Sequence, residues 1–388
     1  MFKRLVKLPE NKSFFLFGPR QVGKTTVLGE FFDDKNTLVY NLLDPDTFNA
    51  LNLSPSNFKN EITSRKKNVS HVIVDEIQKL PELLDQVHLL LESENPPCFA
   101  LSGSSARKLK KSGANLLGGR AWTIAMYPLC YQEFLLNKQT FNLEQALNYG
   151  TLPAIYLEED DFAKEQVLKA YINTYLKEEI KEESLVRNIK GFSNFLRFSA
   201  EENGNVLNFS NIARDTGVDS KTVKEYFQIL EDTLIGFFLM PFASSHRTRL
   251  VKHPKFYFFD TGVHRALTNK LSLKLEKKTK AYGNAFEHFI IKELMNYSNY
   301  INKDYDFFFY RTEAGAEVDL IIKKPDDSFL AIEIKASINP ELKNLKGLFS
   351  FKDLYPEAEL ICLSQATKRR KLKEITILPW QEIFEYLV

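Results

Sequence analysis

The sequence predicts an α/β protein with an N-terminal parallel sheet flanked by helices, a middle helical and winged-helix domain, and a C-terminal α/β domain. Three observations lead to this prediction. Short apolar runs alternate with helix-compatible segments over residues 1–135, the order that is typical of a parallel sheet. One of these runs is followed by a glycine-rich turn, and another ends in two acids. Helical patterns dominate residues 136–270, and residues 281–388 combine helix and strand again.

The glycine-rich turn reads Gly18-Pro-Arg-Gln-Val-Gly-Lys-Thr-Thr26, between an apolar strand and a helix-compatible run. This is the phosphate-binding P-loop pattern in the context that supports it. Glycines let the backbone approach phosphates, and N–H groups at the helix N-terminus then point at the anion. We expect Lys24 to reach the β- and γ-phosphates of ATP and Thr25 to bind Mg²⁺. The expected nucleotide-binding residues are Gly18, Pro19, Arg20, Gln21, Val22, Gly23, Lys24, Thr25 and Thr26.

The acid-ended run is His71-Val-Ile-Val-Asp-Glu76, which is typical of a buried parallel strand. Open α/β sheets bind ligands at the carboxyl ends of their strands. We expect Asp75 to hold Mg²⁺, directly or through water, and Glu76 to polarise the attacking water, because neighbouring strand residues point opposite ways. An ordinary core strand with a polar end is the alternative.

Two further groups could serve the same site. A strand over residues 98–102 is followed by Gly103-Ser-Ser105, so the hydroxyl of Ser102 or Ser104 could orient the hydrolytic water. A plain serine–glycine turn has the same pattern. Arg120 follows two glycines and could stabilise charge at the γ-phosphate, in cis or from a neighbouring subunit of a homo-oligomer. A surface or ion-paired arginine is the alternative.

The middle segment contains a helix–turn–helix pattern over residues 207–230, with Gly217 in the turn and Asp219 or Ser220 as the next N-cap. A long amphipathic helix is expected over residues 167–184, and strands over 235–240 and 255–259 would form a wing. Duplex DNA is the expected partner, through groove and phosphate contacts; the residues are Ser220, Lys221, Thr222, Lys224, His246, Arg247, Arg249, Lys252 and Lys255. A winged helix used for protein packing is the alternative.

The C-terminal segment carries a second set of reactive groups. Glu287 lies on an expected helix, Asp319 near the start of an expected strand, and Glu333 and Lys335 on the next strand. Glu333 and Lys335 are two residues apart and point to one face, and a hairpin can bring Asp319 beside them. Carboxylates that hold Mg²⁺, here Asp319 and Glu333, and a lysine that stabilises charge are the parts of a metal-dependent phosphodiesterase. A salt-bridged solvent face is the alternative.

Composition narrows the classes of protein. Of 388 residues, 44% are hydrophobic and 26% charged, with a net charge of +2, so the charge neither requires nor excludes nucleic acid. The longest apolar runs are shorter than a membrane helix and the start lacks a signal-peptide pattern, so we expect a cytoplasmic protein without a membrane partner. Cys98, Cys130 and Cys362 are far apart, as in a reducing compartment. The lysines of residues 270–280 are expected to be solvated.

The chain resembles, over nearly its full length, a widespread prokaryotic family of uncharacterised ATPases. In that family an AAA-type P-loop domain is fused to a winged helix and to a C-terminal, restriction-endonuclease-like domain similar to the PD-(D/E)xK nucleases. The resemblance rests on motifs that occur in the family's order: the P-loop, Val74-Asp-Glu-Ile-Gln78, Leu101-Ser-Gly-Ser-Ser105, Gly119-Arg120, Tyr149-Gly-Thr-Leu-Pro153, Phe256-Tyr-Phe-Phe-Asp-Thr-Gly262, Tyr310-Arg-Thr312, Glu317-Val-Asp319 and Ala331-Ile-Glu-Ile-Lys335.

This resemblance implies a role for the C-terminal residues. Glu287, Asp319, Glu333 and Lys335 match the nuclease signature, with Val318 where the signature has proline. An ATP-dependent, DNA-associated enzyme with a metal-dependent nuclease site is the leading interpretation. A nucleotide-controlled switch or scaffold, whose inactive nuclease-like domain binds DNA or a protein partner, is the alternative.

Overall fold

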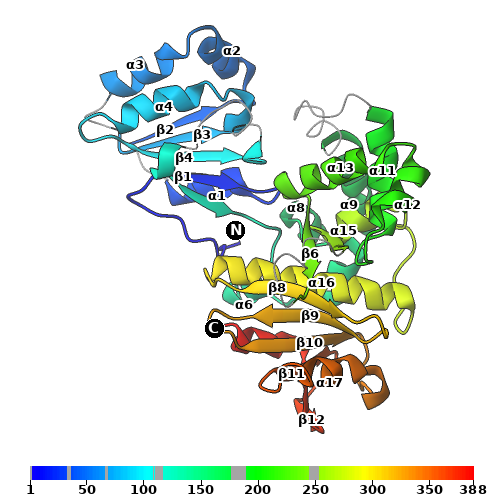
Figure 1. Ribbon diagram of the computed structural model, residues 1–388. Coiled ribbons are helices and arrows are strands. Elements are labelled where there is room, and N and C mark those ends of the chain that lie inside the picture. The colour runs from blue at the N-terminus through cyan, green and yellow to red at the C-terminus, as the bar shows by residue number, and fades with distance from the viewer. Residues whose placement is uncertain are drawn as a thin grey trace.

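The computed structural model describes residues 2–32, 36–65, 69–107, 109, 117–175, 189–243 and 253–388. Figure 1 shows an N-terminal sheet with its helices in blue and cyan, a helical middle part in green, and a second sheet in yellow to red. None of the helices in the described ranges is both long and apolar enough to cross a bilayer.

The N-terminal sheet has five strands in the order β2-β3-β4-β1-β5, and all its pairs are parallel, as the sequence predicts. Its strands are β1 Phe14–Phe17, β2 Thr37–Asn41, β3 His71–Asp75, β4 Cys98–Gly103 and β5 Trp122–Ala125. Its helices include α1 Lys24–Phe31, α2 Pro45–Leu53, α3 Ser56–Ser64 and α4 Leu83–Leu91. Because neighbouring strands are parallel, the carboxyl ends of β1, β3 and β4 lie at the same edge of the sheet, where the P-loop begins.

The middle part is helical and contains the expected helix–turn–helix backbone. Gly217 ends the first of these helices in the left-handed conformation, with φ of 70°, and the Asp219 carboxylate caps the second by accepting from the backbone N–H of Lys221 and Thr222. The helix expected over 167–184 begins earlier, as α9 Asp161–Ala170, and continues as a π-helical turn, η4 Tyr171–Tyr175; residues 176–184 lie outside the described residues. The helices are α6 Tyr131–Leu136, α7 Leu143–Tyr149, α8 Pro153–Tyr156, α9 Asp161–Ala170, η4 Tyr171–Tyr175, α11 Ile189–Glu201, α12 Phe209–Thr216, α13 Ser220–Asp232 and α15 Thr261–Leu267.

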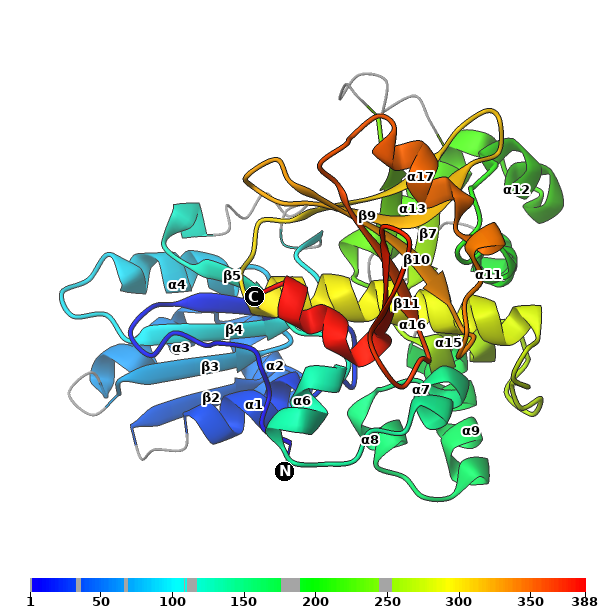
Figure 2. The ribbon, with the colours of Figure 1, turned by 90° about the horizontal axis from the view of Figure 1, so that it is seen from below.

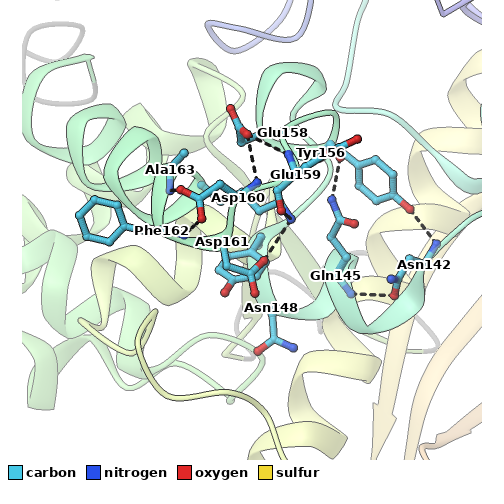
Figure 3. A network of polar contacts seen from close by, with 12 residues as sticks. Asn142, Gln145, Asn148, Tyr156, Glu158, Glu159, Asp160, Asp161, Phe162 and Ala163 are labelled. Carbon is cyan, nitrogen blue, oxygen red and sulfur yellow. Dashed lines mark hydrogen bonds and ion pairs between the residues drawn. The ribbon is translucent and has the colours of Figure 1, made fainter.

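Polar contacts link α7 with α8, and a separate set caps the N-terminus of α9 (Figure 3). The Asn142 amide oxygen caps α7 by accepting from the Gln145 N–H at 3.1 Å, and the Gln145 amide donates to the Tyr156 carbonyl at 2.6 Å. The Asp160 carboxylate caps α9. The Lys274 ammonium, from the lysine-rich connector, pairs with the neighbouring Asp161. The Lys274 side chain is still 56% exposed, so this is a surface pair of a solvated lysine.

The second sheet has eight strands in the order β12-β13-β11-β10-β9-β8-β6-β7. The strands expected to form a wing, β6 and β7, lie at one end of this sheet, because β6 pairs in parallel with β8 at Met240↔Phe308. One continuous sheet therefore joins the middle and C-terminal segments. Its strands are β6 Gly236–Pro241, β7 Lys255–Phe258, β8 Asp306–Arg311, β9 Glu317–Lys323, β10 Phe329–Lys335, β11 Glu359–Ser364, β12 Arg370–Leu372 and β13 Ile375–Pro379.

Two helices cover opposite faces of this sheet. The long helix α16, Lys280–Tyr300, packs through Phe286 and Phe289 with Leu320 and Ile332. The short helix α17, Lys346–Lys352, packs with the alternate residues of the same strands, which is the two-residue period of a strand. In Figures 1 and 2 the yellow α16 lies in the centre of the molecule, and its contacts extend to α7 and α15.

Candidate active sites

The loop after β1 has the backbone that a P-loop needs. Gly23 has φ of 96° and is the N-cap of α1, so the helix N-terminus opens directly onto the loop. Gly18 lies so close to β5 that an added Cβ would be 2.3 Å from the Met126 carbonyl oxygen. Both positions therefore require glycine for a backbone reason, in addition to close approach to phosphate.

Lys24 is held against the loop. Its ammonium donates to the carbonyl oxygens of Gly18 at 2.7 Å and Pro19 at 3.0 Å, and the residue is 6% exposed. These contacts keep the charge beside the backbone turn in which phosphates would sit. Binding of the β- and γ-phosphates by Lys24 stays a prediction.

The structure brings Thr25 and Asp75 together, as predicted. The Thr25 hydroxyl donates to Asp75 Oδ2 at 2.7 Å, and the Ser102 hydroxyl donates to Asp75 Oδ1. A hydroxyl and a carboxylate in contact at the mouth of a P-loop are the oxygen donors that Mg²⁺ prefers, so these residues fit the ion. Ser102 is thus a partner of the Asp75 carboxylate.

Glu76 is engaged by a residue that the sequence analysis did not single out. It has φ of 60° and begins the tight turn η2, Ile77–Lys79, which folds Gln78 back over it. The Gln78 amide nitrogen donates to Glu76 Oε2 and to the Ser104 hydroxyl, the latter at 3.1 Å. Gln78 therefore links the expected base to Ser104. Gln78 is part of the motif Val74-Asp-Glu-Ile-Gln78, but its contact with Glu76 depends on the turn, which the motif alone does not predict.

Arg120 lies away from the P-loop. It precedes β5, whose first residue Trp122 pairs with Phe14 at the start of β1, whereas the P-loop leaves the opposite end of β1. Its guanidinium contacts Glu92 at 3.3 Å. A role of Arg120 at the γ-phosphate, in cis or on a neighbouring subunit, stays a proposal.

A different arginine, Arg4, contacts the backbone of the P-loop. The Arg4 guanidinium donates to the Val22 carbonyl at 2.6 Å and to the Tyr127 carbonyl at 2.7 Å, and forms an ion pair with Glu133 at 2.8 Å. The side chains of Arg4 and Glu133 are 5% and 0% exposed. The Tyr300 hydroxyl, at the end of α16, is 3.4 Å from Arg4, so this contact joins the loop to the helix that carries Glu287.

The second expected site is assembled around a cavity of about 360 Å³. Glu287 from α16, Asp319 from β9, and Glu333 and Lys335 from β10 all line it. Its wall also includes the middle segment, through Asn203, Gly204, Asn205, Val206, Lys255 and Tyr257. The structure therefore brings all four predicted residues together, and adds residues from a segment expected to be a separate domain.

Lys335 connects two of the acids. Its ammonium is 2.6 Å from Glu333 Oε1 and 3.6 Å from Asp319 Oδ2. Burial alone lowers the pKa of Lys335, but the charges of Asp319 and Glu333 outweigh it and the net pKa is raised. The backbone N–H of Ile334 donates to Asp319 Oδ2 at 2.7 Å, which fixes that carboxylate on the next strand.

Glu333 carries the observation that points to a cation. Its Oε2 atom is buried and has no hydrogen-bond partner among the described residues, which is rare for a carboxylate. Burial and the Asp319 charge raise the pKa of Glu333 to about 8, and the same two causes raise that of Glu287 to about 7. Asp319 and Glu333 fit Mg²⁺ as two carboxylate ligands completed by water or phosphate oxygens. Among the described residues, no three or more His, Cys, Asp or Glu side chains are placed so that they could bind one metal ion together.

Lys255 differs from its expected place. The sequence suggested a wing lysine for phosphate contacts, but the residue is 4% exposed and its ammonium is 2.8 Å from Glu317 Oε1. It faces the acidic cavity, because β7 belongs to the same sheet as β9. By contrast, Lys221 and Lys224 are exposed on α13. His246, Arg247, Arg249 and Lys252 lie outside the described residues, and DNA contact by this segment stays a prediction.

Comparison with protein families assigns three segments. Residues 10–135 match an AAA domain, residues 140–276 match a domain of unknown function (DUF8612), and residues 282–383 match another domain of unknown function (DUF4143). With the geometry of the P-loop, the first match supports an ATP-binding, AAA-type domain at the N-terminal end of the chain.

Relatives in other organisms match most of the chain. An uncharacterized protein of Methanocaldococcus jannaschii is 25% identical over 339 residues, which are 82% of this chain and 73% of the relative. One of Mycobacterium tuberculosis is 23% identical, over 84% of this chain and 71% of the relative. Among solved structures, the replication initiator DnaA bound to AMPPCP and single-stranded DNA is 14% identical over 57% of this chain and 82% of that chain, with a TM-score of 0.27. A DNA replication initiation factor is 11% identical over 75% of this chain and 88% of that chain, with a TM-score of 0.26. Scores this low do not indicate a shared overall fold.

Proposed function

We propose that this protein binds and hydrolyses ATP at the P-loop, acts on duplex DNA, and hydrolyses phosphodiesters at the cavity between α16 and the second sheet. The observation that carries the proposal is the contact of Thr25 with Asp75 beside Lys24. It joins the phosphate-binding turn to the acidic strand at one edge of a parallel sheet, where ligands bind in α/β folds.

At the P-loop each residue has a separate task. Backbone N–H groups and Lys24 bind the phosphates, and Thr25 and Asp75 would hold Mg²⁺, which neutralises charge on the β- and γ-phosphate oxygens. Glu76 polarises a water, whose oxygen bonds to the γ-phosphorus as the bond to the β–γ bridging oxygen breaks. Ser104 and Gln78 orient Glu76 through the contacts between the three side chains.

Phosphate release from ATP tests this half of the proposal. Lys24→Ala and Glu76→Gln should each lower the turnover rate by at least about 100-fold. The first removes the positive charge that binds the transferred phosphoryl group, and the second removes the base. Lys12→Ala, at an exposed lysine of the same domain, is the matched control. Equal rates in the wild type and in Lys24→Ala would contradict ATP hydrolysis at this loop.

At the cavity the arrangement suits phosphodiester hydrolysis. Asp319 and Glu333 would hold Mg²⁺, which supplies a Lewis acid for the phosphate and a more acidic bound water. Lys335 lies against both carboxylates and can stabilise charge on the phosphate oxygens. Arg311 and Lys280 also line the cavity and are exposed, so they can bind phosphates on either side of the cleaved one.

Nicking of supercoiled duplex DNA in Mg²⁺ tests this half. We expect Asp319→Asn and Lys335→Ala to abolish cleavage, and Asp304→Asn, at an exposed acid of the same segment, to retain it. Cleavage that survives Lys335→Ala would mean that the activity arises elsewhere.

A nucleotide-controlled switch with an inactive cavity is the second candidate. The contact of Gln78 with Glu76 favours it, since a carboxylate held by an amide is less available to activate water. The lack of a described three-acid metal group favours it as well. Slow turnover, tight retention of ADP and metal-independent binding of DNA or of a protein partner would distinguish this function from the first.

A further inference from the structure

The wing strand β7 reaches the cavity from the far end of the second sheet. Lys255 and Tyr257 are two residues apart on β7, so their side chains lie on the same face of the strand. That face is covered by α16, because Tyr257 packs in one cluster with Phe286 and Phe289 of α16. Residues of β7 therefore lie directly opposite the helix that carries Glu287.

Both side chains contact the same atom of Glu287. The Tyr257 hydroxyl donates to Glu287 Oε1 at 2.7 Å, and the Lys255 ammonium is 3.8 Å from that oxygen. Two contacts on one oxygen restrain the rotation of the carboxylate of a residue that lines the cavity.

Lys255 is built into the protein as a fixed positive charge. Its side chain is 5% exposed, lies 5.2 Å from the centre of the Phe309 ring, and pairs with Glu317 at 2.8 Å. Burial lowers the pKa of Lys255, but the charges of Glu287, Asp319 and Glu317 outweigh it and raise the net pKa. Lys255 thus stays protonated and cannot act as a base near neutral pH.

The two lysines divide the four acids of the cavity between them. Lys335 pairs with Asp319 and Glu333, whereas Lys255 pairs with Glu317 and approaches Glu287. If these pairs only held the sheet together, we would expect the buried oxygens to be satisfied, because an unpaired buried polar atom destabilises a fold. The unpartnered Glu333 Oε2 instead indicates that the acids are kept ready for a cation.

We propose that Lys255 and Tyr257 are positioning residues of the cavity, which orient Glu287 toward a divalent cation held by Asp319 and Glu333. The site is then composite, with one wall from the middle segment and one from the C-terminal segment. This inference rests on the proposed phosphodiesterase function, and it extends that function to residues outside the nuclease-like motif.

Binding of Mn²⁺ to the full chain without nucleotide tests the inference, with the binding lost in Asp319→Asn taken as the signal of the cavity. Tyr257→Phe removes one hydroxyl and keeps the ring, and it should weaken this binding about 10–100-fold, the usual effect of losing a group that orients a metal ligand. Tyr310→Phe is the matched control, because Tyr310 packs on the opposite face of the sheet and contacts Ser350. Lys255→Met should weaken Mn²⁺ binding and Lys255→Arg should restore much of it.

A double-mutant cycle separates positioning from general stability. In a Glu287→Gln background, Tyr257→Phe should have no further effect on Mn²⁺ affinity, because both changes act through one carboxylate. Unchanged affinity in Tyr257→Phe, with binding still lost in Asp319→Asn, would overturn the inference and leave the proposed function standing. A wild-type protein without binding sensitive to Asp319→Asn would overturn both. Additive effects in the cycle would also overturn the inference.

Discussion

Gln78 is the residue whose place in the P-loop site most changes the chemistry expected of it. It is 3% exposed and donates to both Glu76 and Ser104, so it determines where the carboxylate points. A hydrogen bond to a charged group contributes about 1.5–3 kcal/mol, which corresponds to a roughly 10–100-fold effect on rate if it is needed in the transition state.

We therefore expect Gln78→Ala to lower kcat for ATP hydrolysis about 10–100-fold. KM should change little, because the side chain of Gln78 acts on Glu76 and Ser104 and not on the turn that binds the phosphates. Steady-state phosphate release measures both constants. Gln139→Ala, at an exposed glutamine, is the control. A faster rate in Gln78→Ala would instead identify the contact as a restraint on Glu76 and favour the switch function.

The raised pKa values of Glu287 and Glu333 predict a pH-dependent stability. A carboxyl whose pKa is higher in the folded state stabilises the fold below its unfolded pKa of about 4.3, and this contribution is lost as pH rises through the folded value. With folded values of about 7 and about 8, the metal-free protein should lose stability between about pH 5 and pH 8. Thermal unfolding in a chelator measures this.

Two controls sharpen the pH experiment. Added Mg²⁺ should restore stability mainly at the alkaline end, where the carboxylates are charged and able to bind it. Asp319→Asn removes a charge that raises both pKa values and should flatten the profile. A wild-type profile that is flat from pH 5 to pH 8 would contradict the description of the cavity.

Among the structural elements, the loop between β1 and α1 offers a matched pair of glycines. Gly18→Ala would place a Cβ 2.3 Å from the Met126 carbonyl, so the loop must shift, whereas Gly29 in α1 has open space around it. We expect Gly18→Ala to weaken ATP binding at least about 10-fold, and Gly29→Ala to leave it unchanged while stabilising the helix by up to about 1 kcal/mol. Titration with a fluorescent ATP analogue measures affinity. Equal affinities in the two variants would contradict the close packing of loop and β5.

Elements with strong local signals were predictable from the sequence. The P-loop, the Gly217 turn and the Asp219 cap each depend on residues a few positions apart, and the hairpin of β9 and β10 forms with Phe329 opposite Lys323. Pairing between distant segments was not predictable. The parallel pairing of β6 with β8 places Met240 opposite Phe308, and no local sequence pattern in either strand indicates this pairing. For this reason Lys255 was expected on the surface, yet it is buried.

At the scale of the whole molecule, buried and partly buried polar contacts connect the N-terminal sheet with the rest of the chain. Arg4 joins the P-loop to Glu133 and to Tyr300 of α16. Arg107, just after β4, pairs with Asp232 at the end of α13, and the Tyr171 hydroxyl donates to the Arg20 carbonyl. These contacts tie the N-terminal domain to α16, α13 and η4. The contacts of Arg4 with Glu133 and Tyr300, of Arg107 with Asp232 and of Tyr171 with Arg20 could not be predicted from local patterns, because the partners lie more than a hundred residues apart.

Arg4 provides the test at this scale. Removing one partner of a buried ion pair costs about 3–5 kcal/mol, because it leaves the other charge uncompensated. We expect Arg4→Met to lower the free energy of unfolding by that amount. It should also weaken ATP binding, because the Val22 carbonyl in the P-loop loses its hydrogen bond from Arg4. Denaturant unfolding measures the first effect, with Lys7→Met as an exposed control. A variant as stable as the wild type would contradict the role assigned to Arg4.

The central claim is that nucleotide hydrolysis at the P-loop serves an action on DNA. The most direct measurement is the steady-state rate of ATP hydrolysis in Mg²⁺, with and without duplex DNA, for the wild type and for Lys221→Ala with Lys224→Ala on α13. The account predicts that DNA stimulates the wild type and that the double variant keeps the basal rate but loses the stimulation. A rate that DNA leaves unchanged would contradict the claim.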